Sequence, residues 1–284
     1  MMPMPVPARR DEAFWIQAAG IEGGGIRPPA ALRNKRLYRK ALFVVVLALS
    51  VASLVLAVFP QLDLAVSRLF WTADGGFWMS RYPVLNGLRQ VSMIPTIGLG
   101  VVSLIALVVK IAWPGSKPIL PARMAVFFVA SMLASTIVLV NVVLKEHWAR
   151  ARPVHVTEFG GRWTFQPWWQ PGDGTGCRTN CSFISGEASG AAWLVAPALV
   201  APPAVRPAAL VAVGVYTVAI SALRMAYGGH FLSDVLIAIL ATLLIVIGFH
   251  YWIYQRWGWP DDDVVADRLG AIGRSIRGLF SRKS

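Results

Sequence analysis

Apolar stretches of about twenty residues recur along this chain, and they constrain its fold more than any other feature. Stretches of that length with few charges are typical of helices that cross a bilayer. Hydropathy predicts six of them, at Ala41–Phe59, Met93–Trp113, Met124–Leu144, Glu187–Val205, Ala208–Tyr227 and Phe231–Tyr254. The fourth is the weakest, because it is short and prolines interrupt it. We therefore expect an all-α fold, a six-span transmembrane helical bundle with interfacial helices.

The composition agrees with a membrane protein. Hydrophobic residues make up 56% of the chain and charged residues only 14%, against about 25% charged residues in an ordinary soluble domain. The formal net charge of +13 raises the question of nucleic acid. Membrane spans with basic flanks account for it more simply. We therefore expect the bilayer as a partner and no nucleic acid.

The chain divides into three parts on this interpretation. Residues 1–40 form a basic, proline-rich leader, residues 41–254 the six-span core, and residues 255–284 an amphipathic tail. The first span begins too late to resemble a cleaved signal peptide, so it is interpreted as a retained anchor.

The distribution of basic residues predicts the orientation. With six spans and a cytoplasmic N-terminus, most of the 27 Lys and Arg residues fall on the cytoplasmic side, as the positive-inside rule requires. Leader and tail are then both cytoplasmic. The expected location is a bacterial inner membrane, crossed several times.

Three polar runs stand at the ends of these spans, and all face the outer side in this topology. They are Lys145-x6-Arg152-Pro153, Ser185-Gly186-Glu187 and Arg224-x5-His230-x3-Asp234. Their three cations suit the oxygens of a phosphoryl group. His230 and Asp234 are four residues apart and share a helix face, where a carboxylate can hold an imidazole N–H.

Each group also has a plainer explanation. Lys and Arg at span ends often anchor a helix at the interface, and a Ser-Gly pair before a helix is most often an N-cap. A lone His at a span end is more often interfacial than nucleophilic. The ordered combination of all three runs favours one phosphate site facing the periplasm.

The three runs resemble the signature of the type-2 phosphatidic acid phosphatase family, membrane lipid phosphatases with a six-helix core. That signature reads Lys-x6-Arg-Pro, then Pro-Ser-Gly-His, then Ser-Arg-x5-His-x3-Asp. The first run is complete here, and the third differs only at Leu223, where the family has Ser. In the second, Ile184 replaces Pro and Glu187 stands where the family has His.

The resemblance implies a mechanism that needs no metal or other cofactor. His230 would attack phosphorus and carry the phosphoryl group, and Asp234 would orient its ring. The implied phosphate-binding residues are Lys145, Arg152, Ser185, Gly186 and Arg224.

Glu187 leaves alternatives open. A protonated Glu187 can act as the general acid that the family's His provides. Alternatively, the leaving group needs little help, as when a diphosphate loses its terminal phosphate, with His147 or His155 assisting weakly. A third alternative is an enzyme that is impaired or changed in reaction.

The sequence thus predicts an integral membrane phosphatase acting on a phosphomonoester or terminal diphosphate of a lipid. Candidate substrates are polyprenyl diphosphate, lipid A, phosphatidylglycerophosphate and phosphatidic acid. A lipid phosphotransferase using the same His, or a non-catalytic lipid-binding or transport protein, are the alternatives. The oligomeric state stays open.

Three further segments carry expectations. The aromatic-rich loop 154–184 is either a headgroup-level belt or a lid, and it contains Cys177 and Cys181, which an oxidising outer face would allow to pair. Residues 62–89 suit a helix lying on the interface. The stripe of apolar residues after Asp263 suits a surface helix on anionic lipid.

Overall fold

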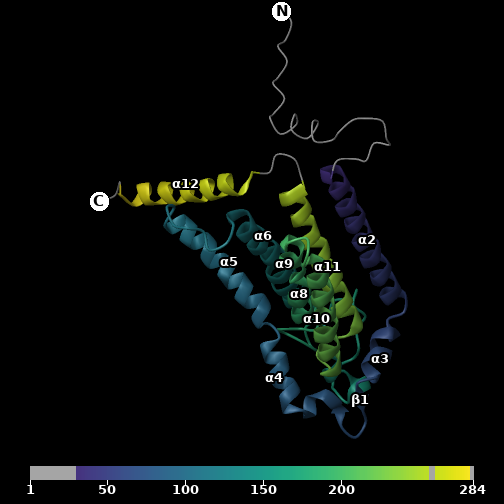
Figure 1. Cartoon of the computed structure of the whole chain (residues 1–284). Coiled ribbons are helices and arrows are strands. Elements are labelled where there is room, and N and C mark those ends of the chain that lie inside the picture. The colour runs from purple at the N-terminus through teal and green to yellow at the C-terminus, as the bar shows by residue number, and fades with distance from the viewer. Residues whose placement is uncertain (1–29, 256–259, 282–284) are drawn as a thin grey trace, which may run out of the picture.

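The computed structural model describes residues 30–255 and 260–281 (Figure 1). Within these ranges the regular secondary structure is helical apart from one short antiparallel hairpin, β1 (Trp71–Thr72) and β2 (Gly76–Phe77), and an isolated bridge between Val156 and Trp163. Most of the predicted leader, residues 1–29, lies outside the described residues. The described helix α2 begins at Ala30 and ends at Val58, so it starts earlier than the predicted first span.

Long apolar helices form the body of the molecule. They are α2, α5 (Ile94–Ala112), α6 (Ala122–Met132) with its π-helical continuation η2 (Leu133–Leu144), α10 (Arg206–Ala226), and α11 (Leu232–His250) with the π-helical η5 (Tyr251–Gln255). Five helical stretches of the described chain are long and apolar enough to cross a membrane, namely Lys35–Val58, Gly87–Ala112, Ala122–His147, Arg206–Ala226 and Leu232–Gln255. The predicted all-α membrane bundle is therefore confirmed.

The predicted fourth span is interrupted, as its prolines indicated. It consists of two short helices, α8 (Gly186–Trp193) and α9 (Val195–Val200). Pro197 has no N–H to donate to the carbonyl of Trp193, so the helix breaks between them. Pro202 then disfavours helical backbone at Ala201, which is extended. The total of six spans stays a prediction.

Small residues let α8 lie in the centre of the bundle, packed against α10, α11 and η2. Polar contacts tie it to its neighbours. The Ser189 hydroxyl lies 3.2 Å from that of Thr136 and 2.8 Å from that of Thr242, and Thr96 donates to the carbonyl oxygen of Gly190 at 2.8 Å. Small residues and interhelical hydrogen bonds of this kind stabilise helix contacts where water is absent.

Short elements gather at one end of the bundle (Figure 1). Between α2 and α5 these are α3 (Gln61–Arg68), the hairpin, η1 (Trp78–Arg81) and α4 (Pro83–Val91); between η2 and α8 they are α7 (Lys145–His147), η3 (Pro153–His155) and η4 (Thr157–Phe159). A buried cluster that includes Phe77, Val156, Phe159 and Phe231 joins the hairpin to the loop and to the start of α11. The aromatic loop is thus folded onto the bundle end.

At the opposite end, α12 (Asp262–Ser281) lies across the ends of α5 and α6 (Figure 1). Asp262 accepts a hydrogen bond from the main-chain N–H of Arg123 at 2.9 Å. This contact satisfies one of the free N–H groups at the start of α6. It also places a carboxylate at the positive end of that helix dipole, where negative charge is stabilising.

Candidate active site

A cavity of about 230 Å³ opens where α8 and α11 begin. Predicted site residues that line it are Lys145, Arg152, Gly186, Glu187, Arg224 and His230. Residues that sequence reasoning did not assign also line it, namely Arg89, Met93, Thr136, Asn141 and Asn180. The three polar runs therefore reach one cavity from α7 (Lys145–His147), the outer loop, α8, α10 and the turn before α11.

A tight turn brings the last two cavity residues together. Gly228 has a φ of +64°, a left-handed conformation that glycine adopts without strain. Gly229 donates its N–H to the carbonyl of Arg224 at 3.0 Å, and a Cβ on Gly229 would lie 2.8 Å from the Arg224 guanidinium. The glycines thus let the chain return close enough to Arg224 to place His230 in the same cavity.

The His230 imidazole is buried, and its Nδ1 lies 2.7 Å from the carbonyl oxygen of Ser182. Because a carbonyl only accepts hydrogen bonds, Nδ1 carries the proton and Nε2 keeps its lone pair. Burial lowers the pKa of His230 to about 4, since a charged ring is disfavoured away from water. The ring is therefore neutral near pH 7, with Nε2 available to a bound group.

Asp234 lies near the Nδ1 side of the His230 ring and does not line the cavity. Its carboxylate Oδ2 lies 3.7 Å from His230 Nδ1 and accepts hydrogen bonds from the Ser182 hydroxyl at 2.5 Å and from the main-chain N–H of Phe231 at 2.8 Å. The nearest acceptor for the imidazole N–H is thus the Ser182 carbonyl. Asp234 lies near the ring and also holds the side chain of Ser182, whose carbonyl contacts the ring.

Arg150 is a buried residue that sequence reasoning missed. Its Nη1 donates to Asp234 Oδ1 at 2.5 Å, and its Nη2 donates to Asp63 Oδ2 at 2.8 Å. Ser233 joins the group, because its hydroxyl contacts both Arg150 at 2.8 Å and Asp63 at 2.6 Å. The side chains of Arg150, Asp63 and Asp234 are wholly inaccessible to solvent.

These contacts give one cation two carboxylate partners, as a charge needs when it is removed from water. Two features of the sequence could have indicated these residues. Arg150 sits inside the Lys145-x6-Arg152 run, and Asp63 is the acidic residue of α3. Neither signal says which charge meets which, because Asp63 and Arg150 are far apart in the chain.

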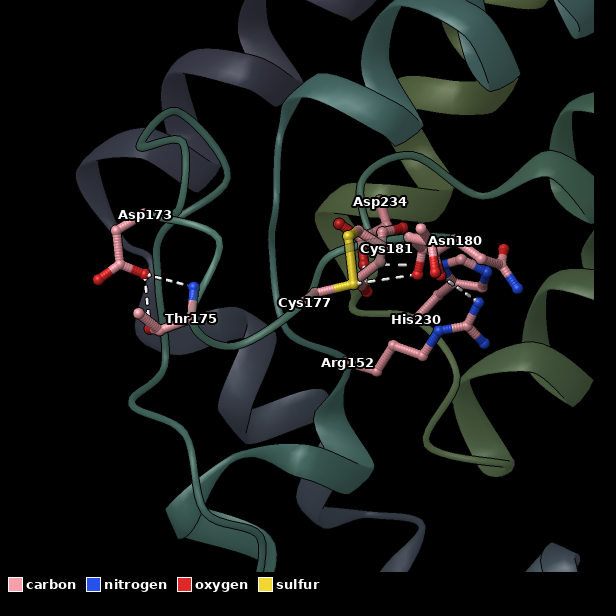
Figure 2. The surroundings of a disulfide bond; sticks show 10 residues. Arg152, Asp173, Thr175, Cys177, Asn180, Cys181, His230 and Asp234 are labelled. Atoms are coloured by element: carbon pink, nitrogen blue, oxygen red, sulfur yellow. Dashed lines mark hydrogen bonds and ion pairs between the residues drawn. A yellow bond between two sulfur atoms is a disulfide. The ribbon is translucent and has the colours of Figure 1, made fainter.

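Among the phosphate-binding candidates, Arg152 is held from the outer loop. Its Nη2 donates to the carbonyl oxygen of Asn180 at 2.8 Å. Asn180 lies within the loop closed by a disulfide between Cys177 and Cys181, the pairing that the sequence left open. Figure 2 shows this disulfide beside Asn180, with the Arg152 side chain reaching toward Asn180 and His230.

Glu187 forms ion pairs with two guanidinium groups. One carboxylate oxygen contacts Nε of Arg224, and the other lies 3.6 Å from Nε of Arg89. The carboxylate also lies in the first turn of α8, where the helix dipole favours negative charge. A phosphate that reaches Arg224 must therefore share this cation with Glu187 or displace it.

Ser185 has a structural position. Its hydroxyl accepts a hydrogen bond from the N–H of Ala188 at 3.3 Å, which makes it the N-cap of α8. Its own N–H donates to the carbonyl of Asp234 at 3.1 Å. Ser185 is fully buried and does not line the cavity, whereas the adjacent Gly186 does.

The two histidines considered as weak helpers, His147 and His155, are not among the residues that line the cavity. Nδ1 of His147 lies 2.9 Å from the Val143 carbonyl on an exposed surface. Within residues 30–255 and 260–281, no group of three or more His, Cys, Asp or Glu side chains has an arrangement that could hold a metal ion.

Comparison with known proteins agrees with this geometry. The model of the PAP2 superfamily matches residues 124–258, a segment that contains all three polar runs. Over that segment, which is a little under half of the chain, this protein resembles the PAP2 superfamily. The resemblance to type-2 phosphatidic acid phosphatases is thus confirmed for the family.

Curated relatives cover part of the same region. A lipid A 4'-phosphatase of Rhizobium leguminosarum is 34% identical over 97 residues, which are 34% of this chain and 40% of that protein. A lipid A 4'-phosphatase of Francisella tularensis subsp. novicida is 40% identical over 87 residues, which are 30% of this chain and 38% of that protein. The match therefore spans about two fifths of each relative. No solved structure matches the chain significantly.

Proposed function

We propose that this protein is a membrane phosphatase that removes a phosphate group from a lipid. The observation that carries the proposal is one cavity lined by Lys145, Arg152, Arg224 and the neutral imidazole of His230. The match of residues 124–258 to the model of the PAP2 superfamily supports it. The cations suit the non-bridging oxygens of a phosphate, where charge is spread in the transition state.

The proposed reaction has two steps. In the first, the Nε2 lone pair of His230 attacks phosphorus, and the bond from phosphorus to the lipid oxygen breaks with its electron pair leaving on that oxygen, which takes up a proton. In the second, water attacks phosphorus and loses a proton, the P–N bond breaks, and orthophosphate is released. The Ser182 carbonyl holds the Nδ1 proton throughout, and Asp234 stabilises the positive ring of the intermediate.

The proposed location is a bacterial inner membrane with the cavity on the periplasmic side. The cavity lies at the bundle end where interfacial elements gather, so the acyl chains of a substrate can stay in the bilayer while its phosphate enters. The names of the curated relatives favour a phosphate of lipid A as the first substrate to test.

The test is phosphate release from purified protein in micelles, with a panel of phosphorylated lipids that includes lipid A, polyprenyl diphosphate and phosphatidic acid. We expect release with EDTA present and no acceptor lipid, and a loss of at least about a thousandfold in His230→Ala, as when a nucleophile is removed. Transfer to a second lipid without free phosphate would identify a phosphotransferase. Full activity of His230→Ala would end the proposal.

Glu187→Gln separates the alternatives for Glu187. If Glu187 is the general acid, we expect the variant to slow hydrolysis of a monoester much more than that of a diphosphate, whose leaving group needs less help. If Glu187 only competes with phosphate for Arg224, the variant binds substrate more tightly and turns both over. Unchanged turnover on every substrate would exclude the general-acid role.

A further inference from the structure

A second hollow of about 530 Å³ lies at the end of the bundle opposite the proposed active site. The connection between α5 and α6 contributes Trp113, Pro114, Gly115 and Ser116, and α12 contributes Arg274 and Arg277. It shares no lining residue with the cavity around His230.

The hollow has a fixed base, because α12 packs closely on the end of α5. A Cβ on Gly273 would lie 1.8 Å from the carbonyl oxygen of Ile111, and a Cβ on Gly270 would lie 3.1 Å from Pro114. Arg277 donates from Nη1 to the carbonyl of Ala112 at 3.2 Å, so it satisfies one of the last carbonyls of α5. The glycines thus set the distance between the two helices.

The charge around the hollow is positive. Lys110 donates to the carbonyl of Pro114 at 2.8 Å, and Lys117 follows directly after the lining residue Ser116. No Asp or Glu is among the residues that line the hollow. The Ser116 hydroxyl is buried without a hydrogen-bond partner among the described residues, so it adds a donor that the protein itself does not satisfy.

Exposed apolar side chains lie on the segments that form this positive hollow. Trp113, Ile272 and Ile276 are exposed, and exposed Val and Ile residues continue along α5 toward the bundle centre. Trp beside basic residues is typical of the boundary between headgroups and acyl chains. The phosphate of a membrane lipid would sit at the two guanidinium groups while its chains follow the apolar surface of α5.

We propose that this hollow binds the headgroup of an anionic phospholipid in the leaflet on the α12 side. Guanidinium groups hold phosphate oxygens through paired, charge-assisted hydrogen bonds. Each basic residue near an anionic surface contributes about 1 kcal/mol. A zwitterionic lipid is disfavoured, because its own cation would face Arg274, Arg277, Lys110 and Lys117. The site is independent of the phosphatase proposal.

The experiment uses the whole protein in nanodiscs that contain a small fraction of phosphatidylglycerol with a photoreactive headgroup. Cross-linked peptides are mapped by mass spectrometry, which separates this hollow from the cavity around His230. We expect cross-links in residues 113–116 and in α12. In Arg274→Gln we expect these cross-links to fall about fivefold, the equivalent of one basic contact.

Arg268→Gln is the matched control, since Arg268 is exposed on the same helix but does not line the hollow; it should keep the cross-links. The same probe with a phosphocholine headgroup should give none above background. Equal labelling of Arg274→Gln and Arg268→Gln, or equal labelling by the phosphocholine probe, would overturn the proposal. So would complete displacement of the lipid probe by inorganic phosphate, which would indicate a site for a free anion.

Discussion

At the scale of single residues, the proposed nucleophile is held by the main chain and by a buried set of charges. Ser182 has two contacts in this set: its carbonyl accepts from His230, and its hydroxyl donates to Asp234. Arg150 then links Asp234 to Asp63 on α3. The position of the imidazole therefore depends on residues that do not line the cavity.

Asp63→Asn tests this dependence. The change leaves Arg150 with Asp234 as its one carboxylate, and breaking a buried ion pair typically costs about 3–5 kcal/mol. We expect a clearly lower midpoint of thermal unfolding and a loss of phosphate release beyond what unfolding explains. Asp74→Asn, at an exposed position of the hairpin turn, is the control, and equal midpoints for the two variants would contradict the prediction.

The pH dependence of activity tests the state of His230. Its pKa is lowered to about 4 by burial, so the ring is neutral and nucleophilic above that pH and gains a proton as the pH falls through it. We expect kcat/KM to fall on the acid side of its pH profile with a midpoint near pH 4. The profile is first corrected for ionisation of the lipid phosphate, which is measured separately by 31P NMR. A midpoint at pH 6.5, the pKa of an unperturbed His, would contradict the prediction, because it would show that burial does not lower the pKa of His230.

At the scale of elements, the outer loop positions one of the cations. The disulfide between Cys177 and Cys181 constrains the loop. The carbonyl of Asn180, which lies between these two cysteines, accepts a hydrogen bond from Arg152. The loop also packs on the bundle, because Trp168 donates to the Ser53 carbonyl of α2 at 3.2 Å. These contacts hold the loop on the bundle, with Asn180 lining the cavity.

The double variant Cys177→Ser with Cys181→Ser removes the disulfide. We expect KM for the lipid to rise about tenfold with little change in kcat, since one hydrogen bond to a charged group contributes about 1.5–3 kcal/mol and the nucleophile stays in place. Reduction of the wild type with dithiothreitol should reproduce the change and leave the double variant unaffected. A fall in kcat with constant KM would place the effect on His230 instead.

Sequence reasoning reached the helices and the three polar runs because both are local patterns. The apolar lengths predicted the bundle, and the spacing from Arg224 to Asp234 predicted neighbouring side chains. The prolines indicated an interrupted fourth span, but not where its two helices, α8 and α9, begin and end. Sequence reasoning did not reach the contact of Arg150 with Asp63 or that of Glu187 with Arg89, because both depend on which distant segments pack together.

At the scale of the whole molecule, the two ends of the bundle differ in character. The end with the His230 cavity carries short elements and the aromatic loop, and the other end carries α12 and its basic hollow (Figure 1). The positive-inside rule predicts that α12 is cytoplasmic. The proposed phosphatase site then faces the periplasm.

Labelling of single cysteines tests this orientation. Asp74→Cys and Ser275→Cys place exposed thiols at the two ends, each in a background without Cys177 and Cys181. A membrane-impermeant maleimide should label Asp74→Cys on intact spheroplasts and Ser275→Cys only after lysis. The reverse pattern would invert the predicted topology and place the His230 cavity in the cytoplasm.

The ion pair between Arg150 and Asp63 joins the region that matches the PAP2 superfamily model to a residue outside that region. Arg150 lies inside residues 124–258 and Asp63 well before them. A chimera that grafts this region onto a foreign N-terminal half inherits a guanidinium with a missing counter-ion. Such a chimera needs an acidic residue at the position that corresponds to Asp63. The N-terminal part and the matching region can therefore be exchanged between proteins only together.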